Sequence, residues 1–174
     1  MWYLAFISFL LLGGYLLLMA LRFGIPNMVS DTYYQLQPTT GSEIAPFRKP
    51  RNMGWLFSLI MVAVAFMMLI SILDIGMGIQ FFAFLGCAGL CFVGFSPNYC
   101  DRDTYSMHKT AAIIAAVGSV GWCVSVSLIP TFVILTIYLA YAYHSRRGKV
   151  SHPWYWVEVC GFIDVFATYA IIHL

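Results

Sequence analysis

Charged residues are scarce in this chain. Only 9% of its 174 residues are Asp, Glu, Lys or Arg, whereas an ordinary soluble domain contains about 25%. Hydrophobic residues make up 61% of the chain, and the mean hydropathy is +0.84. So few charges cannot cover a surface that faces water, and the composition therefore predicts an integral membrane protein. The net charge of +2 is too small to favour nucleic acid as a partner.

The sequence also lacks the spacings that hold metal ions or build disulfide frameworks. Four of its five cysteines lie in apolar runs, where a thiol behaves as a small packing residue. No CxxC, HxxxH or HExxH motif is present. We therefore expect no disulfide framework, no cofactor and no metal ion. A metal site at one membrane face is the alternative, with His108, His144 and His152 as its ligands.

Long apolar runs predict six membrane-crossing helices, because a span needs roughly 20 apolar residues to cross about 30 Å of hydrocarbon. The first run has no basic segment before it and is too long for a signal peptide, so it is interpreted as a transmembrane helix. Residues 110–143 carry no charge. As one helix they would be about 51 Å long, and a break near Ser125, Ser127 and Pro130 is predicted instead. The predicted spans are about 2–21, 54–73, 79–96, 107–126, 128–143 and 154–174, with a polar loop at 22–53. The predicted fold is all-α: a polytopic integral membrane protein whose single domain, residues 1–174, is a compact bundle of six transmembrane helices.

The basic residues are distributed unevenly along the chain. All nine Lys and Arg residues lie in or beside three connectors of the six-span arrangement, residues 22–53, 97–106 and 144–153. The positive-inside rule then predicts that these connectors are cytoplasmic and that both termini are outside, in a plasma membrane or a bacterial inner membrane. A five-span arrangement would put Lys109 and Arg146 on opposite faces.

Two of the predicted helices carry small residues four positions apart. These are Ala83, Cys87 and Cys91, with Gly86 beside them, in the third helix, and Ala111, Ala115, Ser119 and Cys123 in the fourth. Small residues at this spacing let helix backbones approach closely in lipid. We expect the two helices to pack against each other inside the bundle. A homo-oligomer seam or a substrate groove along the Ala111 face is the alternative.

The polar loop contains "SDTYYQLQ" (30–37), in which tyrosines stand among polar residues. This stretch predicts a short interfacial helix or an extended strand, and a flexible loop is the third interpretation.

Three carboxylates lie in or beside apolar runs, where ionisable groups are costly and mark functional sites by default. Asp74 precedes Gly76 and Gly78 in a predicted turn, which favours a structural role near the membrane surface. Glu158 and Asp164 lie in the last predicted helix, about 120° apart around its axis, so they do not form a paired acid site. Asp164 is expected to face the bundle interior, bonded to a polar neighbour or protonated. A functional role for Asp164 and a structural hydrogen bond both remain open.

The remaining polar side chains gather on the basic side of the predicted bundle. His108 opens the fourth predicted helix just before its small-residue face, and a histidine can titrate near neutral pH. The catalytic candidates are His108, Asp31, Asp101 and Asp103, and the binding candidates are Ser30, Asn98, Glu158 and Asp164. The alternative is a hydrogen-bonded network that closes the end of the bundle or contacts lipid headgroups, with His108 as an interfacial residue.

Two stretches, "IPNMVSD" (25–31) and "LCFVGFSPNYCDRDTYSMHKTAA" (90–112), resemble motifs of a known family. Pro26, Ser30 and Asp31 match a turn after the first span, and Gly94, Pro97 and His108 match the end of the third span and the start of the fourth. Ser96 stands between Phe95 and Pro97, which are adjacent in the family pattern. The chain is thus similar to the six-span superfamily of the FGF-receptor-activating protein and the damage-regulated autophagy modulators, with its uncharacterised bacterial branch. The resemblance implies roles in lipid remodelling, membrane lipid organisation or stress response, without agreed catalytic residues. It also implies an exoplasmic first loop, opposite to the charge rule.

These features predict a membrane protein that handles or organises lipid, with membrane lipids as its partners. No motif fixes a nucleophile, which argues against an enzyme. An intramembrane lipid hydrolase or acyl-transfer enzyme with a His/Asp site at one face is the first alternative. A small transporter or channel subunit, with Glu158 and Asp164 along its path, is the second, although no inverted repeat is detectable.

Overall fold

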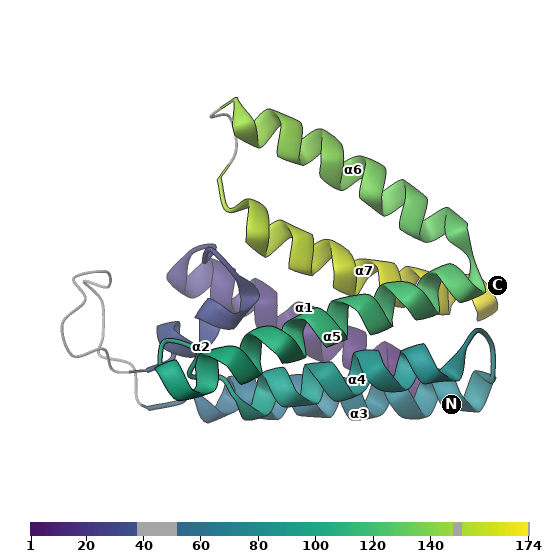
Figure 1. The fold of residues 1–174 in the computed structure, drawn as a ribbon, viewed down its shortest axis with the longest axis horizontal. Helices are drawn as coiled ribbons and strands as arrows, with labels where there is room; N and C mark the ends of the chain where they lie inside the picture. Colours follow the sequence, from purple (N-terminus) through teal and green to yellow (C-terminus); the bar gives the residue numbers. More distant parts are fainter. Residues whose placement is uncertain (38–51, 148–150, 174) are drawn as a thin grey trace.

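The described part of the chain consists of helices and short connectors. The computed structural model describes residues 1–37, 52–147 and 151–173. The helices are α1 (Trp2–Phe23), the 3-10 helix η1 (Val29–Asp31), α2 (Thr32–Gln35), α3 (Trp55–Ile75), α4 (Gln80–Phe95), α5 (Arg102–Val126), α6 (Leu128–Arg146) and α7 (Pro153–His173) (Figure 1). No strand occurs within these ranges, so the predicted all-α class is confirmed.

Five helices are long and apolar enough to cross a membrane. They are α1, α3, α5, α6 and α7, with lengths of 19 to 25 residues. The apolar α4 has only 16 residues, which corresponds to about 24 Å of helix against a hydrocarbon core of about 30 Å. The structure therefore contains several helices compatible with membrane insertion, five of them full-length candidate spans rather than the predicted six.

Two helix ends explain how the long apolar segment 110–143 is divided. α5 begins at Arg102, earlier than the predicted residue 107, because Asp101 caps it: the Asp101 carboxylate accepts a hydrogen bond from the Asp103 N–H at 3.5 Å. α5 ends at Val126, and Ser127 caps α6 by accepting from the Ile129 N–H at 3.3 Å. The predicted break is confirmed, whereas residues 102–106 extend α5 and do not belong to a connector.

The predicted turn after α3 is also present. Gly76 ends α3 with a left-handed φ of 69°, and Gly78 has a φ of 72°. Glycine adopts such angles without the steric penalty of a Cβ. Asp74 is exposed in the last turn of α3, where it pairs with the amino group of Met1. This position agrees with the structural role expected for Asp74.

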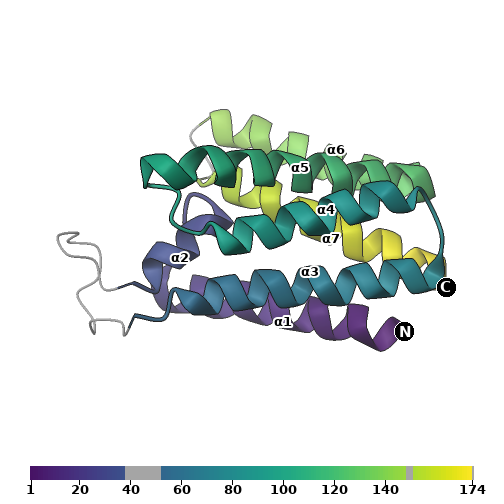
Figure 2. The same cartoon turned by 60° about the horizontal axis from the view of Figure 1, so that its bottom comes forward.

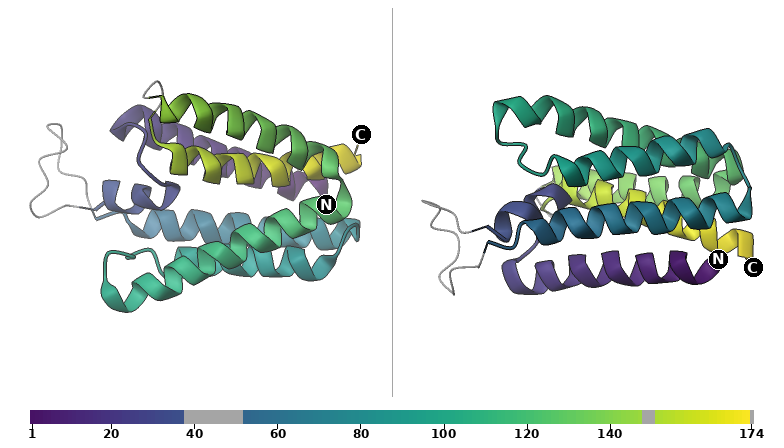
Figure 3. Two further views of the ribbon diagram at one scale, coloured as in Figure 1. Left: turned by 45° about the horizontal axis from the view of Figure 1, so that its top comes forward. Right: turned by 90° about the horizontal axis from the view of Figure 1, so that it is seen from below.

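The long helices lie side by side and alternate in direction (Figures 1 and 2). One end of the bundle, the turn end, carries both termini and the turns at 76–79 and 127. The other end, the loop end, carries the described connector residues 24–37, 52–54, 96–101 and 151–152. α6 lies outermost, against α7 (Figure 3), and Pro130 is its single buried residue.

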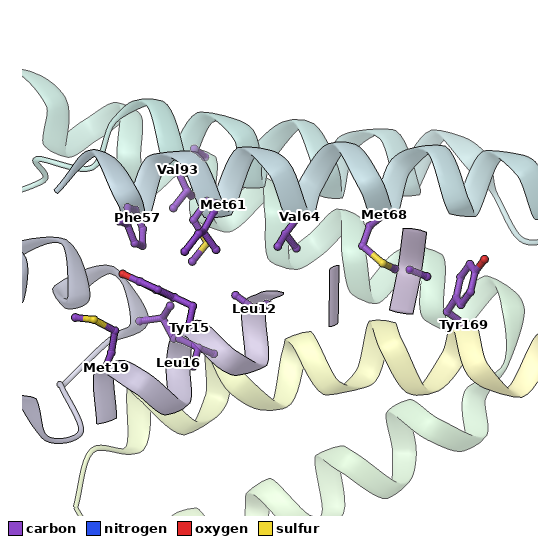
Figure 4. Packing of buried hydrophobic residues seen from close by; sticks show 14 of the residues in the cluster. Leu12, Tyr15, Leu16, Met19, Phe57, Met61, Val64, Met68, Val93 and Tyr169 are labelled. Carbon is purple, nitrogen blue, oxygen red and sulfur yellow. The ribbon is translucent and has the colours of Figure 1, made fainter. Parts of the chain in front are cut away.

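Much of the apolar core lies between α1 and α3 (Figure 4). Leu12 and Met19 of α1, with Phe57 and Met61 of α3, are at most 2% exposed. The outer faces of the same helices are equally apolar, for example Leu17 at 60% exposure. Buried and outward-facing side chains of these helices are therefore equally apolar and differ in how well they pack against a neighbouring helix. This is expected for helices packed in lipid.

The predicted tight packing of α4 on α5 is confirmed, and glycines make its shortest backbone contacts. A Cβ added to Gly118 would lie 2.3 Å from the Gly86 backbone nitrogen, and one added to Gly89 would lie 2.4 Å from the Ala115 nitrogen. Gly86 and Gly89 therefore make the closest approach. Gly86 and Cys87, the latter part of the predicted stripe, also border a cavity.

The small-residue face of α5 is largely used within the chain. Ala111 and Cys123 are buried, and Ala115 and Ser119 lie against α4. The packing expected inside the bundle accounts for this face, and the oligomer seam stays an untested prediction.

The "SDTYYQLQ" stretch is helical, as one of its three interpretations predicted, and it turns back into the loop end of the bundle. Val29, Ser30 and Thr32 are buried there. The Thr32 hydroxyl donates to the Val29 carbonyl at 2.6 Å and accepts from the Tyr15 hydroxyl of α1 at 2.7 Å. The strand interpretation was wrong. Most of the remaining polar loop, with its cluster of Arg48, Lys49 and Arg51, lies outside the described residues.

Candidate functional site

Ser30 and His108 form the centre of a buried polar cluster at the loop end. Both residues are only 7% exposed. The His108 Nδ1 lies 2.7 Å from the Ser96 carbonyl oxygen, and the His108 Nε2 lies 3.1 Å from the Ser30 Oγ. A carbonyl oxygen only accepts hydrogen bonds, so Nδ1 carries the proton. In the neutral imidazole, Nε2 then presents its lone pair to the Ser30 hydroxyl.

Tyr99 connects this pair to Asp31. The Tyr99 ring packs against the His108 imidazole with 5.0 Å between ring centroids, and its hydroxyl donates to the Asp31 carboxylate. Asp31 also accepts from the backbone N–H of Met28 at 3.0 Å. Burial raises the pKa of the Asp31 carboxyl above its ordinary value, although backbone hydrogen bonds oppose the shift. The cluster therefore joins the first connector, the 96–101 connector and α5.

Glu158 ties α7 to the same connector. Its carboxylate accepts a hydrogen bond from the Val29 N–H at 2.6 Å. Glu158 lies one turn inside α7, and the connector residue that it contacts, Val29, directly precedes Ser30. This contact fixes the position of η1 against the end of the bundle.

A cavity of about 300 Å³ lies between α3, α4, α5 and α7 and begins at this cluster. The polar side chains in its wall are Ser30, Ser119, Glu158 and Asp164; the other lining residues are apolar, cysteine or glycine. Ligand pockets commonly measure about 300 to 1,000 Å³. Ala116 and Val120 of the wall are exposed, so the cavity reaches the surface beside α5.

Gly161 forms part of the cavity wall on α7, between Glu158 and Asp164. A Cβ added to Gly161 would have no neighbouring atom within 4 Å. The absent side chain therefore contributes to the open space in the middle of the cavity.

Asp164 lies deeper in the bundle than Glu158, about 9 Å further along α7 at the usual helical rise. It is buried at 4% exposure, as expected from the sequence, and accepts a hydrogen bond from the Thr131 hydroxyl of α6 at 3.2 Å. Asp164 thus has the polar neighbour that a buried carboxyl requires, and this bond attaches the outlying α6 to α7.

Several predicted site residues lie apart from the Ser30–His108 pair. Asp101 and Asp103 are exposed at the start of α5, where Asp101 acts as the helix cap. Asn98 is exposed and accepts from the Tyr34 hydroxyl at 3.2 Å. No contact joins His108 to Asp101, whose carboxylate caps α5, or to the exposed Asp103, whereas Asp31 reaches the cluster through Tyr99.

The three histidines considered for a metal site are also dispersed. His144 is exposed at the end of α6, and His152 lies 3.2 Å from the Asn27 side-chain oxygen. Among the described residues, no group of three His, Cys, Asp or Glu side chains is arranged to hold a metal ion.

Sequence reasoning missed two members of the cluster, Ser96 and Tyr99. Ser96 participates through its backbone carbonyl, which no residue pattern reveals. Tyr99 carried a weak signal, an aromatic residue between Pro97 and the Asp101 cap, but its contact with His108 depends on the path of the connector.

No protein-family model, curated protein or solved structure matches this chain. The similarity to the FGF-receptor-activating protein superfamily therefore remains an expectation from the motifs.

Proposed function

We propose that this chain is a six-span membrane protein that binds one membrane lipid, with an acyl chain in the cavity and the polar part of the lipid at Ser30 and Glu158. The observation that carries the proposal is the cavity itself, which is apolar along most of its length and polar where it meets the loop end. Lipid handling is also what the resemblance to the six-span superfamily implies.

An unfilled apolar cavity leaves the side chains of its wall without van der Waals partners on one side, so an apolar occupant is favoured. Water is a poor occupant, because a buried water needs two to four polar partners and most of this wall offers none. An acyl chain from the surrounding bilayer can enter where Ala116 and Val120 are exposed.

The polar end of the cavity would determine which lipid binds. Lipid tails are as apolar as leucine, so an acyl chain gains little hydrophobic energy by moving from the bilayer into the cavity. Discrimination must then come from hydrogen bonds and charge at the loop end. The carboxylates of Glu158 and Asp31 lie at or beside the polar end and disfavour an anionic headgroup, so a neutral lipid with ester or hydroxyl groups fits best.

The cavity gives less support to a transport path. Between Glu158 and Asp164, the α7 wall consists of Gly161 and apolar side chains, with Ser119 of α5 as the remaining polar group. Charged or strongly hydrated solutes would cross an apolar interval there, at a high desolvation cost.

The six-span topology includes α4 as the short span. Its 16 residues lie beside the longer α3 and α5, and six alternating helices agree with both termini lying at the turn end (Figure 1). The basic residues within the described helices, Arg22, Arg102, Lys109 and Arg146, belong to the loop-end half of their helices, which supports a cytoplasmic loop end. A reporter fused within the 22–53 connector tests this orientation against the exoplasmic loop implied by the family resemblance.

The lipid proposal is tested by filling the cavity. Gly161→Leu places a side chain in the open space, and Gly14→Leu in α1 is the matched control, since a Cβ at either glycine meets nothing within 4 Å and Gly14 lies outside the cavity wall. Purified proteins are extracted and their bound lipid is quantified by mass spectrometry. In Gly161→Leu the new side chain competes with the acyl chain for the same space. An overpacking cost of about 1–3 kcal/mol predicts a loss of lipid affinity of about 5- to 150-fold. A wild-type protein without stoichiometric lipid, or equal lipid in both variants, contradicts the proposal.

A further inference from the structure

We propose that Ser30 and His108 are a nucleophile and its general base, and that they cleave an acyl ester of the lipid held in the cavity. The inference rests on the proposed lipid binding for its substrate, a neutral acyl ester, but the catalytic pair stands on its own geometry. The Ser30 Oγ lies 3.1 Å from the His108 Nε2, within the reach that activates a serine hydroxyl.

The tautomer required for this chemistry is imposed by the fold. The Ser96 carbonyl accepts from Nδ1 at 2.7 Å and thereby holds the Nδ1–H tautomer, so the lone pair on Nε2 faces Ser30. The Tyr99 ring covers one face of the imidazole, and its hydroxyl is anchored on Asp31. A backbone carbonyl here takes the orienting position that a carboxylate occupies in the more familiar serine triads.

Access to substrate separates Ser30 from an ordinary buried serine. Ser30 belongs to the cavity wall, beside the space assigned to the lipid. Ser119, the other serine in that wall, lies against the Gly86 backbone of α4, away from the loop-end cluster. The wall therefore offers one hydroxyl with a base beside it.

The reaction has two balanced steps. In the first, Ser30 Oγ bonds to the ester carbonyl carbon, its proton passes to His108 Nε2, and the ester C–O bond breaks as that proton moves to the leaving alkoxide. The products are acyl-Ser30 and the alcohol part of the lipid. In the second, water attacks the acyl-Ser30 carbonyl, His108 takes the water proton and returns it to Ser30 Oγ, and a fatty acid leaves. A second lipid hydroxyl in place of water gives acyl transfer by the same steps.

The direct test is covalent labelling of the full-length protein in detergent with a fluorophosphonate probe, which reacts with base-activated serines. We expect modification of Ser30, identified by mass spectrometry of its peptide. Ser30→Ala abolishes the label, and His108→Gln slows it by about a hundredfold or more. The control Ser106→Ala changes an exposed serine of α5 outside the cavity wall and labels at the wild-type rate. The wild-type measurement requires no variant to fold, and wild-type protein that stays unlabelled at Ser30 overturns the proposal.

A second measurement, release of fatty acid from a neutral diacylglycerol in mixed micelles, tests the substrate class. Release that depends on Ser30 and His108 supports it, and labelled protein that releases none overturns the assignment of a neutral acyl ester. Failures of the two proposals are distinguishable. Bound lipid with no label at Ser30 refutes the catalytic pair and leaves lipid binding intact, whereas a labelled Ser30 in lipid-free protein refutes the lipid-binding proposal and leaves the pair.

Discussion

The closest approach of two helices gives the sharpest test of the packing. At Gly118 of α5, an added Cβ would lie 2.3 Å from the Gly86 nitrogen, 2.8 Å from the Gly86 Cα and 2.9 Å from the Leu85 carbonyl carbon. All three neighbours are backbone atoms of α4, which cannot rotate aside as a flexible side chain can. The substitution Gly118→Ala therefore forces α4 and α5 apart by about 1 Å before ordinary contact begins at 3.4 Å.

The expected decrease in the free energy of unfolding of Gly118→Ala follows from two opposing effects. Overpacking a close-packed site destabilises by about 1–3 kcal/mol, and the upper end applies where backbone must move. Replacing glycine by alanine inside a helix stabilises by about 1 kcal/mol. We therefore expect Gly118→Ala to lower the free energy of unfolding by about 2 kcal/mol.

The matched control is Gly14→Ala in α1, where an added Cβ has no neighbour within 4 Å. This variant keeps the propensity gain without the clash, so its free energy of unfolding should be unchanged or up to about 1 kcal/mol higher. Both values are measured by reversible unfolding in mixed micelles, followed by circular dichroism. If Gly118→Ala unfolds at the same denaturant concentration as Gly14→Ala, the two backbones are not in contact at this point.

Two further predictions concern the loop end. Asp101→Ala removes the cap of α5 and should lower the free energy of unfolding by about 1 kcal/mol while leaving labelling of Ser30 unchanged; a loss of labelling equal to that of His108→Gln would restore Asp101 to the site. Asp31→Asn tests a pH dependence: because burial raises the pKa of Asp31 in the folded state, the folded chain binds its proton more tightly, and stability falls as the pH rises through that pKa. Denaturant titrations at several acid pH values should show a smaller decline in the free energy of unfolding for Asp31→Asn than for the wild type, with Glu158 and His108 still titrating in both proteins. An identical pH profile would contradict a raised pKa of Asp31 in the folded state.

The helices themselves were largely predictable, because the signals that start and stop them are local. Gly76 ends α3 and Ser127 separates α5 from α6 through backbone and side-chain preferences of single residues. The early start of α5 was also encoded, in Asp101 followed two residues later by Asp103, but it was interpreted as connector polarity because the apolar run begins later. Residues 79–96 were predicted to form a span because they are apolar throughout, but α4 has only 16 residues, fewer than a usual span.

The candidate site was only partly predictable. His108, Ser30 and Asp31 were singled out as polar groups on one side of the bundle, yet nothing in the sequence paired Ser30 with His108, which are 78 residues apart. The sequence also suggested Asp101 and Asp103 as partners of His108 because they are near along the chain. In the structure the Asp101 carboxylate bonds to the backbone of its own helix and Asp103 is exposed, whereas Asp31, far away along the chain, is bonded to Tyr99 beside His108.

The sequence alone predicted the all-helical class: its scarcity of charge and its long apolar runs favour helices in a membrane, where every backbone polar group must be satisfied within its own segment. What only the tertiary structure decided is which faces of these apolar helices meet. In lipid the inner and outer faces have the same polarity, so hydropathy does not distinguish them, and the choice falls to shape. Gly86 and Gly89 approach the α5 backbone, Cys87 and Gly161 border a cavity, and the first connector folds back to bring Ser30 to His108.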